Sequence, residues 1–155
     1  MTPSDINQGD IGNCYFLCAV SALAERPTLI TRLFDITQKN QYGFYSIWLN
    51  IHGIWKQAVI DDLLPCISKN GEMKHIFSES HQPEIWTMLM EKAYAKAYGS
   101  YIRTDGGEPI QALRDLTGAP SYNLTNFKDK QSRDKNFALL REGEVKDYIM
   151  CATTP

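Results

Sequence analysis

The sequence predicts an α+β fold that is mostly helical and contains one β-hairpin. Two observations support this prediction. Apolar residues recur at helical spacing over residues 84–98, which is typical of a helix with one face on a core. Two runs rich in aromatic and β-branched residues, 42–51 and 54–61, are separated only by His52 and Gly53. That short separation indicates two strands joined by a tight turn.

The first helix is expected to run from Cys14 to Glu25, with Asn13 as its cap, because asparagine is favoured at helix N-caps. Pro27 should end this helix, since proline disfavours helical geometry in the residue before it. Proline is also favoured in a first helical turn. Pro27 is therefore expected to open a short second helix that continues through Phe34.

After the hairpin, residues 65–74 are expected to form a loop. The 84–98 helix should close at Gly99, because glycine readily adopts the left-handed conformation that ends helices. Two further short helices are expected, one from residue 108 to 116 and a last one over 137–141.

An apolar strand is expected at residues 145–152, almost at the end of the sequence. A strand left there without a neighbour would be an exposed edge. The 155 residues suffice for one domain with its own core, or for half of a larger unit. The exposed edge favours the second interpretation, in which the sequence is interrupted.

Composition excludes several classes of protein. The net charge is only −2, without the basic excess that a nucleic-acid-binding face needs. No apolar stretch approaches the roughly 18 residues of a membrane span, and the N-terminus lacks the pattern of a signal peptide. Four irregularly spaced cysteines are too few for a disulfide framework in a domain of this length. A globular, intracellular (cytoplasmic) protein is expected.

The segment with the clearest chemical pattern covers residues 8–17. Cys14 lies in the predicted first turn of a helix, where the helix dipole favours a thiolate. Gly9 and Gly12 allow close approach of another backbone. Gln8 lies six residues before Cys14, so its amide and the Cys14 backbone N–H can together form an oxyanion hole. Taken alone, such a cysteine is more often a small buried side chain than a nucleophile.

These residues resemble the sequence around the nucleophile of the calpain family of cysteine proteases. The matching blocks, in chain order, are Gln8, Gly9, Gly12 and Cys14, then Phe16, Leu17 and 21–23, then 53–55, 61–65, Phe77 and Ser78, Glu84 and Trp86, 91–96, 99–101, Gly106 and Gly107, and 112–118. The resemblance spans residues 4–118 and continues weakly to Cys151. Ordered matches over this length are far more specific than a single motif.

The resemblance implies a papain-like core built from two halves, with the active site in the cleft between them. Cys14 would be the nucleophile and Gln8 the oxyanion-hole glutamine. Residues 1–155 would form the first, cysteine-bearing subdomain. The second subdomain, which supplies the family's catalytic histidine and asparagine, is absent from this sequence.

The three histidines, His52, His75 and His81, do not stand in the His-Ala-Tyr context of the family. Surface or turn positions are expected for all of them. A cysteine without an adjacent base is a weak nucleophile toward amides. The chain by itself is therefore expected to be inactive as a protease.

The resemblance also implies Ca²⁺ as a cofactor, bound in each half of the core. Asp5 and Glu84 match the two carboxylate ligands of the first half, and hard oxygen ligands suit calcium. The family's carbonyl ligands would fall just before Met1, which leaves the site incomplete. Alternatively, Asp5 is a loop residue and Glu84 a first-turn carboxylate. A zinc site using Cys14 and Cys18 is disfavoured, because no paired Cys-x-x-Cys spacing is present.

Four positions depart from the family pattern. Asn13 and Tyr15 replace the usual aspartate and tryptophan beside the nucleophile, and both changes are chemically mild. Cys18 replaces a small alanine. Pro3 stands where a basic residue often links the two halves, so the coupling of calcium to cleft closure is in doubt.

The function expected from this resemblance is that of a calcium-dependent cysteine endopeptidase core, with protein substrates and a second core half as partners. Neither a nucleic-acid partner nor a membrane span is expected. The alternative is a non-catalytic calpain-fold module that binds other chains in a larger assembly, because the scaffold is kept and the base is missing. An unrelated thiol enzyme with an acyl intermediate is disfavoured, since the 61–65 and 91–96 blocks have no role in that chemistry.

Overall fold

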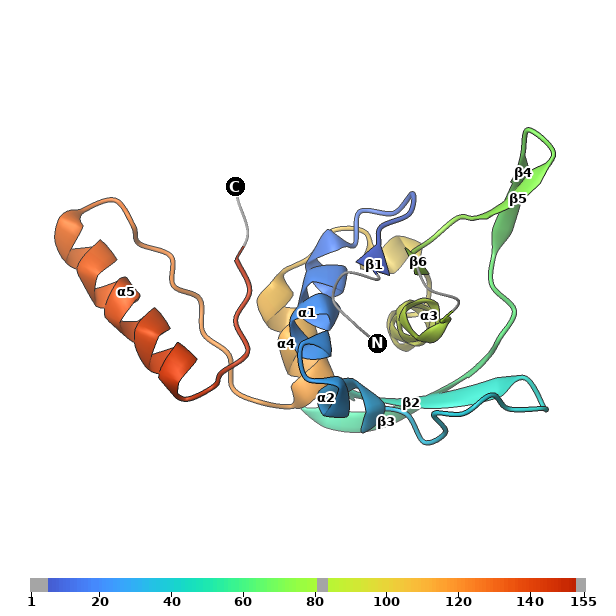
Figure 1. Ribbon diagram of the computed structural model, residues 1–155, viewed down its shortest axis with the longest axis horizontal. Helices are drawn as coiled ribbons and strands as arrows, with labels where there is room; N and C mark the ends of the chain where they lie inside the picture. Colours follow the sequence, from blue (N-terminus) through green and yellow to red (C-terminus); the bar gives the residue numbers. More distant parts are fainter. Residues whose placement is uncertain (1–5, 81–83, 153–155) are drawn as a thin grey trace.

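The computed structural model describes residues 6–80 and 84–152 (Figure 1). In chain order the elements are β1 (Ile6–Asn7), α1 (Cys14–Ala24), α2 (Pro27–Thr31), β2 (Phe44–Ile51), β3 (Ile54–Asp61), β4 (Cys66–Lys69), β5 (Glu72–His75), β6 (Glu79–Ser80), α3 (Trp86–Tyr98), the short 3₁₀-helix η2 (Ile102–Thr104), α4 (Pro109–Thr117) and α5 (Lys130–Val145). The strands of the described part form three antiparallel pairs, β1–β6, β2–β3 and β4–β5. The predicted α+β class is confirmed.

The β2–β3 hairpin forms where the sequence predicts it. Its register runs from the Phe44–Asp61 pair to the Ile51–Ile54 pair, next to the turn. His52 and Gly53 have φ values of 55° and 80°. Two consecutive positive φ values define the tight turn whose twist matches that of paired strands.

The core lies between this hairpin and three helices. α1 packs against α4, while α3 and α4 contact the strands (Figure 1). The fully buried apolar side chains come from all of these elements and include Phe16, Val20 and Leu23 of α1, Ile47 and Leu49 of β2, Met90 and Ala93 of α3, and Ala112 and Leu116 of α4. Burial of this shared set is the main force that holds the helices on the hairpin.

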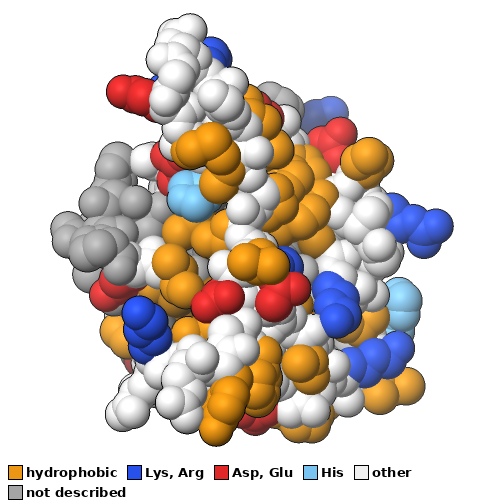
Figure 2. All heavy atoms as spheres, turned by 90° about the vertical axis from the view of Figure 1, so that its right-hand side faces the viewer, with side chains coloured by type: hydrophobic (Ala, Val, Ile, Leu, Met, Phe, Trp, Pro, Cys, Tyr) orange, Lys and Arg blue, Asp and Glu red, His pale blue; other side chains and the backbone are white. Residues whose placement is uncertain are grey.

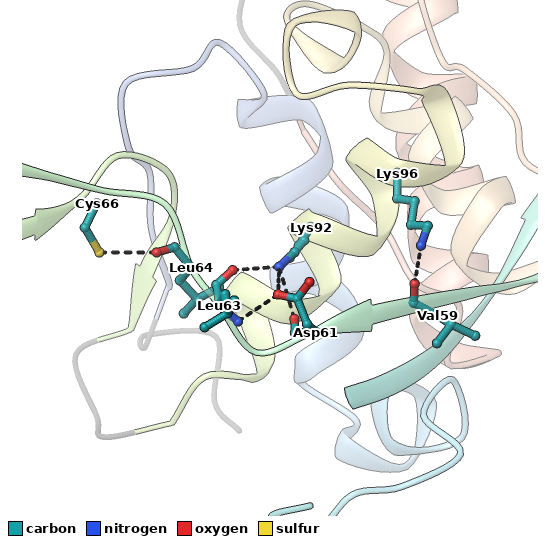
Figure 3. Close-up of polar contacts among 7 residues, drawn as sticks. All are labelled: Val59, Asp61, Leu63, Leu64, Cys66, Lys92 and Lys96. Carbon is teal, nitrogen blue, oxygen red and sulfur yellow. Dashed lines mark hydrogen bonds and ion pairs between the residues drawn. The ribbon is translucent and has the colours of Figure 1, made fainter. Parts of the chain in front are cut away.

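Two lysines of α3 attach it to the hairpin (Figure 3). The Lys92 Nζ atom donates to the Oδ1 atom of Asp61 at 2.5 Å and to the Leu63 carbonyl at 2.6 Å. Lys96 donates to the Val59 carbonyl at 2.5 Å. Residues four apart lie on one helix face, so both ammonium groups reach the same strand edge.

A buried carboxylate joins α3 to α4. The Asp115 side chain is fully buried and accepts hydrogen bonds from the Tyr94 hydroxyl (3.0 Å), the Tyr98 hydroxyl (2.6 Å) and the Gln111 amide (2.7 Å). Burial, together with the hydrogen bond to Asp115, raises the pKa of Tyr98 to about 12. Three donors compensate for the loss of water around this carboxylate.

The loop prediction for residues 65–74 is wrong, because β4 and β5 pair there as a second hairpin. Asn70 and Gly71 have φ values of 55° and 83° and form the same kind of turn as His52 and Gly53. Almost every residue of both strands is exposed. Without a buried face, the strands have no alternating apolar pattern that sequence analysis can detect. In Figure 2, hydrophobic side chains are interspersed with acidic and basic ones around and below this hairpin.

The helix ends agree closely with the sequence. α3 begins at Trp86, two residues later than predicted, and ends before Gly99, which has a φ of 99°. α4 ends before Gly118, whose φ is 66° and whose N–H donates to the Arg114 carbonyl at 2.7 Å. Glycine adopts positive φ without a steric penalty, which explains both ends.

The C-terminal region differs from the prediction. α5 is longer than the predicted helix over 137–141, and Asp129 caps it by accepting a hydrogen bond from the Ser132 N–H at 2.8 Å. The helix projects at the left of Figure 1, far from the two hairpins. None of the described helices is both long and apolar enough to cross a membrane.

The strand predicted at residues 145–152 is wrong. The helix continues through Val145 and ends in a turn, in which Asp147 has a φ of 60°. The Tyr148 N–H donates to the Gly143 carbonyl at 2.8 Å, and the Asp147 N–H to the Glu144 carbonyl at 3.0 Å. This pair of bonds is the Schellman motif, which ends a helix and redirects the chain. The apolar residues that suggested a strand belong to this turn and to the segment after it.

Candidate active site

Cys14 is the first residue of α1 and its side chain is exposed. The helix begins at the predicted residue. The carbonyl of Asn13 accepts hydrogen bonds from the N–H groups of Phe16 (2.9 Å) and Leu17 (3.1 Å), which start the helical ladder. Phe16 and Leu17 are buried. The thiol therefore lies at the accessible end of a helix whose body is fixed in the core.

The predicted side-chain cap by Asn13 is wrong. Asn13 occupies the N-cap position, but its side chain makes no capping hydrogen bond. Its Nδ2 atom instead donates to the Oε1 atom of Glu91 at 2.5 Å. Both side chains are buried, with exposed fractions of 1% and 2%. A buried carboxylate needs hydrogen-bond donors more than an exposed helix end does, because water still reaches that end.

The second oxygen of Glu91 binds the segment that precedes β6. Its Oε2 atom accepts from the Ser78 backbone N–H at 2.9 Å and from the Ser78 hydroxyl at 2.6 Å. Ser78 is fully buried. One carboxylate of α3 thus joins the residue before Cys14 to a strand segment distant in sequence.

The loop before Cys14 lies directly against the chain at residues 76 and 77. The Asp10 N–H donates to the Ile76 carbonyl at 2.9 Å. A Cβ atom at Gly9 would lie 2.3 Å from the Phe77 carbonyl oxygen, far inside contact distance. Gly9 is therefore required by a backbone contact and not by its own φ.

Gly12 makes close contacts on the other side of the loop. Its N–H donates to the Asp105 Oδ1 atom at 3.0 Å, and its carbonyl accepts from the Gly106 N–H at 2.8 Å. A Cβ atom at Gly12 would lie 2.5 Å from that same oxygen of Asp105. The two glycines of the motif therefore allow the loop to be held from two directions.

Gly107 makes a third close contact, with the ring of Tyr15, the residue that follows Cys14. A Cβ atom at this position would lie 2.5 Å from the Cζ atom of Tyr15. The Tyr15 ring also meets the Tyr94 ring edge-on, with centroids 6.5 Å apart. Burial raises the pKa of Tyr15. In the sequence Gly107 is only one of the residues that match the family, whereas the structure gives a steric reason for glycine at this position.

Gln8 lies in the same loop, and its side chain is exposed. Its Nε2 atom donates to the Ile11 carbonyl at 2.7 Å, which turns the amide back onto the loop. The amide nitrogen has two protons, and this bond uses one of them. The described contact of Gln8 is thus with Ile11 and not with Cys14.

The two described histidines lie on the β2–β3 and β4–β5 hairpins. His52 lies in the β2–β3 turn, as predicted. His75, expected at a surface or turn position, is exposed and is the last residue of β5, where its Nδ1 atom lies 3.3 Å from the Cys66 Sγ atom. His81 lies outside the described residues. The recorded thiol contact of His75 is therefore with Cys66 on the exposed hairpin.

The remaining thiols are free, and two of them lie close together. Cys151 donates to the Cys18 carbonyl at 3.8 Å, which places the C-terminal segment against α1. Burial, together with the neighbouring Cys18 thiol, raises the pKa of Cys151 to about 12. This thiol is thus held in its protonated form at neutral pH.

The predicted calcium ligands are covered only in part by the described residues. Glu84 is half-buried and precedes α3, whereas Asp5 and Pro3 lie outside the described residues. Within 6–80 and 84–152, no three carboxylate, histidine or cysteine side chains gather as a metal site. One carboxylate supplies at most two of the roughly six to eight oxygens that calcium takes. Of the two predicted carboxylate ligands, the described residues thus include only Glu84.

Comparisons with known proteins identify the family. The family model described as calpain family cysteine protease matches residues 1–155. The chain is 42% identical over 123 residues to the calpain-type cysteine protease DEK1 of Arabidopsis thaliana, covering 79% of this chain and 6% of that protein. It is 37% identical over 153 residues to calpain clp-1 of Caenorhabditis elegans, covering 96% and 19%.

Human calpain-12 is 34% identical over 158 residues, covering 99% of this chain and 21% of the relative. The chain thus spans between 6% and 21% of the length of these curated relatives. The family match covers the loop from Gln8 to Cys14 and the glycine, Glu91 and Asp105 positions that hold it. This chain belongs to the calpain family of cysteine proteases.

Proposed function

We propose that this chain is the nucleophile-bearing first subdomain of a cysteine endopeptidase core, with Cys14 as the nucleophile and Gln8 as an oxyanion donor. The observation that supports this most directly is the exposed Cys14 thiol at the start of a helix whose body is buried. Contacts from Ile76, Glu91 and Asp105 hold the preceding loop. The proposed substrates are proteins, in keeping with the family.

In the proposed reaction the Cys14 sulfur attacks the scissile carbonyl carbon, and the carbonyl electron pair moves onto oxygen. The Cys14 backbone N–H is one donor for this oxyanion, since the first N–H groups of a helix have no partner within it. The second Nε2 proton of Gln8 is the other donor. Collapse of the intermediate expels the amine, and water then hydrolyses the thioester.

The base that accepts the Cys14 proton and later protonates the leaving amine is a histidine from a second core half. His75 does not fill this role, because its thiol contact is with Cys66. The chain alone is therefore proposed to be inactive, with the second half as its partner. A reducing intracellular compartment suits the four free thiols.

Calcium dependence is the part of the proposal that depends on family membership alone, because the described residues supply only Glu84. Glu84 and Asp5 would hold the ion, which would couple metal binding to assembly of the cleft. Isothermal titration of the chain with calcium, compared with Glu84→Gln, tests this part. Equal heats for both proteins would show that Glu84 does not bind the ion. Glu79→Gln is the control for the loss of one carboxylate.

The nucleophile is tested by limited alkylation. The chain is treated with substoichiometric iodoacetamide over a range of pH, with and without calcium, and mass spectrometry identifies the labelled cysteines. Cys14 is expected to be labelled well ahead of Cys66, which is the matched control because it is also free and contacts an imidazole. Cys14→Ser should abolish the fast phase. If Cys14 reacts no faster than Cys66, the non-catalytic interaction module becomes the favoured function.

A further inference from the structure

The carboxylate of Glu91 has both of its oxygens bound inside the protein. Asn13 donates to Oε1, and the backbone and hydroxyl of Ser78 donate to Oε2. Glu91 is 2% exposed and belongs to the middle of α3. Its position is fixed on one side by Ser78, so the remaining oxygen is a rigid acceptor directed at Asn13.

The orientation of the Asn13 side chain follows from this acceptor. A carboxylate can only accept, so the amide must present its Nδ2 protons to Glu91. The Asn13 Oδ1 atom then faces inward, and within the described part of the chain it has no hydrogen-bond partner. The Asn13 side chain thus neither caps the helix nor has a partner for its own oxygen. Its bond to Glu91 holds it in place.

Holding Asn13 has a direct consequence for Cys14. The two residues share a peptide group, and that group is planar. Its carbonyl, from Asn13, is fixed by the bonds from Phe16 and Leu17. Its N–H, from Cys14, is a proposed oxyanion donor. An oxyanion hole works through donors that are oriented before the reaction begins. A rigid Asn13 therefore orients both the donor and the carbon from which the thiol projects.

We propose that Glu91 is a positioning residue for Cys14, acting through the buried hydrogen bond to Asn13. The inference rests on the proposed function, because it concerns the orientation of the nucleophile and its oxyanion donor. Glu91 does not touch the substrate. Its role is to keep the start of α1 in one geometry, at the expense of the side-chain cap.

The test separates positioning from folding by using two thiol reagents. Iodoacetamide reports only whether the thiol is available. A peptidyl chloromethyl ketone also has a carbonyl whose oxygen benefits from the oxyanion donors. The measured quantity is the ratio of the two rates at Cys14. Cys151 should stay unlabelled throughout, which shows that the fold is intact.

Asn13→Ser is the first variant. Serine is a favoured helix cap, so it keeps or strengthens the start of α1, but it is too short to replace the bond to Glu91. The rate ratio is expected to fall about tenfold or more, in the range seen when oxyanion donors are disturbed. A merely structural role for Asn13 predicts an unchanged ratio.

Asn13→Leu is the second variant, because it keeps a side chain of similar size and removes the amide that binds Glu91. The ratio is again expected to fall about tenfold. A double variant, Asn13→Asp with Glu91→Gln, exchanges the donor and the acceptor: Glu91→Gln supplies an amide donor to the new aspartate, while its amide oxygen can still accept from Ser78. The double variant is expected to recover the ratio to within about threefold of the wild type.

The outcomes distinguish this inference from the proposed function. A wild-type ratio in Asn13→Ser, with Cys151 protected, would overturn the positioning role. Failure of the double variant to recover the ratio while it stays folded would also overturn it. If neither reagent labels Cys14 faster than Cys66 in the wild type, the proposed function itself is wrong. If Asn13→Leu does not fold, Asn13→Ser decides the question together with the double variant.

Discussion

The Lys92 ammonium group donates to the Asp61 carboxylate with an Nζ–Oδ1 distance of 2.5 Å, and the same group also donates to two backbone carbonyls. Lys92 directly follows Glu91 on α3. The helix that holds Asn13 is thus itself held by the end of β3 and the turn after it (Figure 3). The start of α1 and the β2–β3 hairpin are connected through neighbouring side chains of one helix.

The Lys92–Asp61 contact predicts acid sensitivity. The hydrogen bond from Lys92, followed by the backbone bond from Leu63, holds the pKa of Asp61 below its ordinary value of 3.8. A carboxylate with a lowered folded-state pKa stabilises the fold above that ordinary value, and the stabilisation is lost as pH falls through the lower folded value. Asp61→Asn should therefore lower the urea midpoint at neutral pH, with the difference closing in acid.

Asp62→Asn is the matched control for this experiment, because it removes a carboxylate next to the same turn without breaking the contact with Lys92. A difference between Asp61→Asn and wild type that persists unchanged in strong acid would contradict the account.

The steric role of Gly9 predicts a large loss of stability on substitution. Gly9→Ala places a methyl group on the Phe77 carbonyl, where backbone must move, so we expect about 3 kcal/mol or more of destabilisation. Gly71→Ala meets no atom within 4 Å and is affected only by its φ of 83°, for about 1 kcal/mol. Chemical denaturation of both variants provides the comparison. Equal losses would show that the loop can move away from residues 76 and 77.

The C-terminal segment contains the thiol that we expect to be alkylated most slowly. The pKa of Cys151 is raised to about 12, so this thiol should be the last to react in alkylation of the folded protein. Arg26 forms an ion pair with Asp147 in the same returning segment. Arg26→Ala is expected to speed labelling of Cys151 by at most about fivefold, since an exposed pair contributes about 1 kcal/mol or less. Lys130→Ala, which breaks a pair within α5, should leave the rate unchanged.

The hydrogen bond from Tyr98 to Asp115 predicts how the stability of the fold changes in alkali. Tyr98 has a folded-state pKa of about 12 against an ordinary 10.0, so the stability it contributes is complete below pH 10 and is lost as pH rises toward 12. Tyr98→Phe should lose about 1–3 kcal/mol at neutral pH, because Asp115 keeps fewer donors. Between pH 10 and pH 12, Tyr98→Phe should also lose less stability than the wild type does.

Ultraviolet titration of tyrosinate gives the Tyr98 value by difference. Tyr122→Phe is the control, because its ring is 83% exposed and lies outside the cluster. Titration of Tyr98 near pH 10 would be incompatible with the buried hydrogen bond to Asp115.

Local patterns in the sequence were sufficient for much of the fold. The His52–Gly53 turn, the proline that opens α2 and the glycines that end α3 and α4 all act through short-range backbone geometry. Prediction failed where the local apolar pattern gave no signal or a misleading one. The β4–β5 hairpin has no buried face, and the apolar residues after Val145 follow a helix end set by Asp147.

The candidate site divides in the same way. The sequence alone led to the proposal of Cys14 and Gln8 as site residues, because the order and spacing of matching blocks along the chain are properties of the sequence. It could not show that the Asn13 side chain binds Glu91, which lies 78 residues away, instead of capping the helix. Nor could it show that Gly9 is required by the backbone of Phe77, or that Gly12 lies against the Asp105 side chain.

The sequence by itself thus determined the family, the starts of α1 and α2, the ends of α3 and α4, the first hairpin and the position of the proposed nucleophile. Only the tertiary structure decided how the loop before Cys14 is held and which partner takes the Asn13 amide. The physical reason is burial. A carboxylate removed from water takes the nearest donors that the packed fold presents, and those donors are set by how α3 packs against distant segments and not by neighbours in the chain.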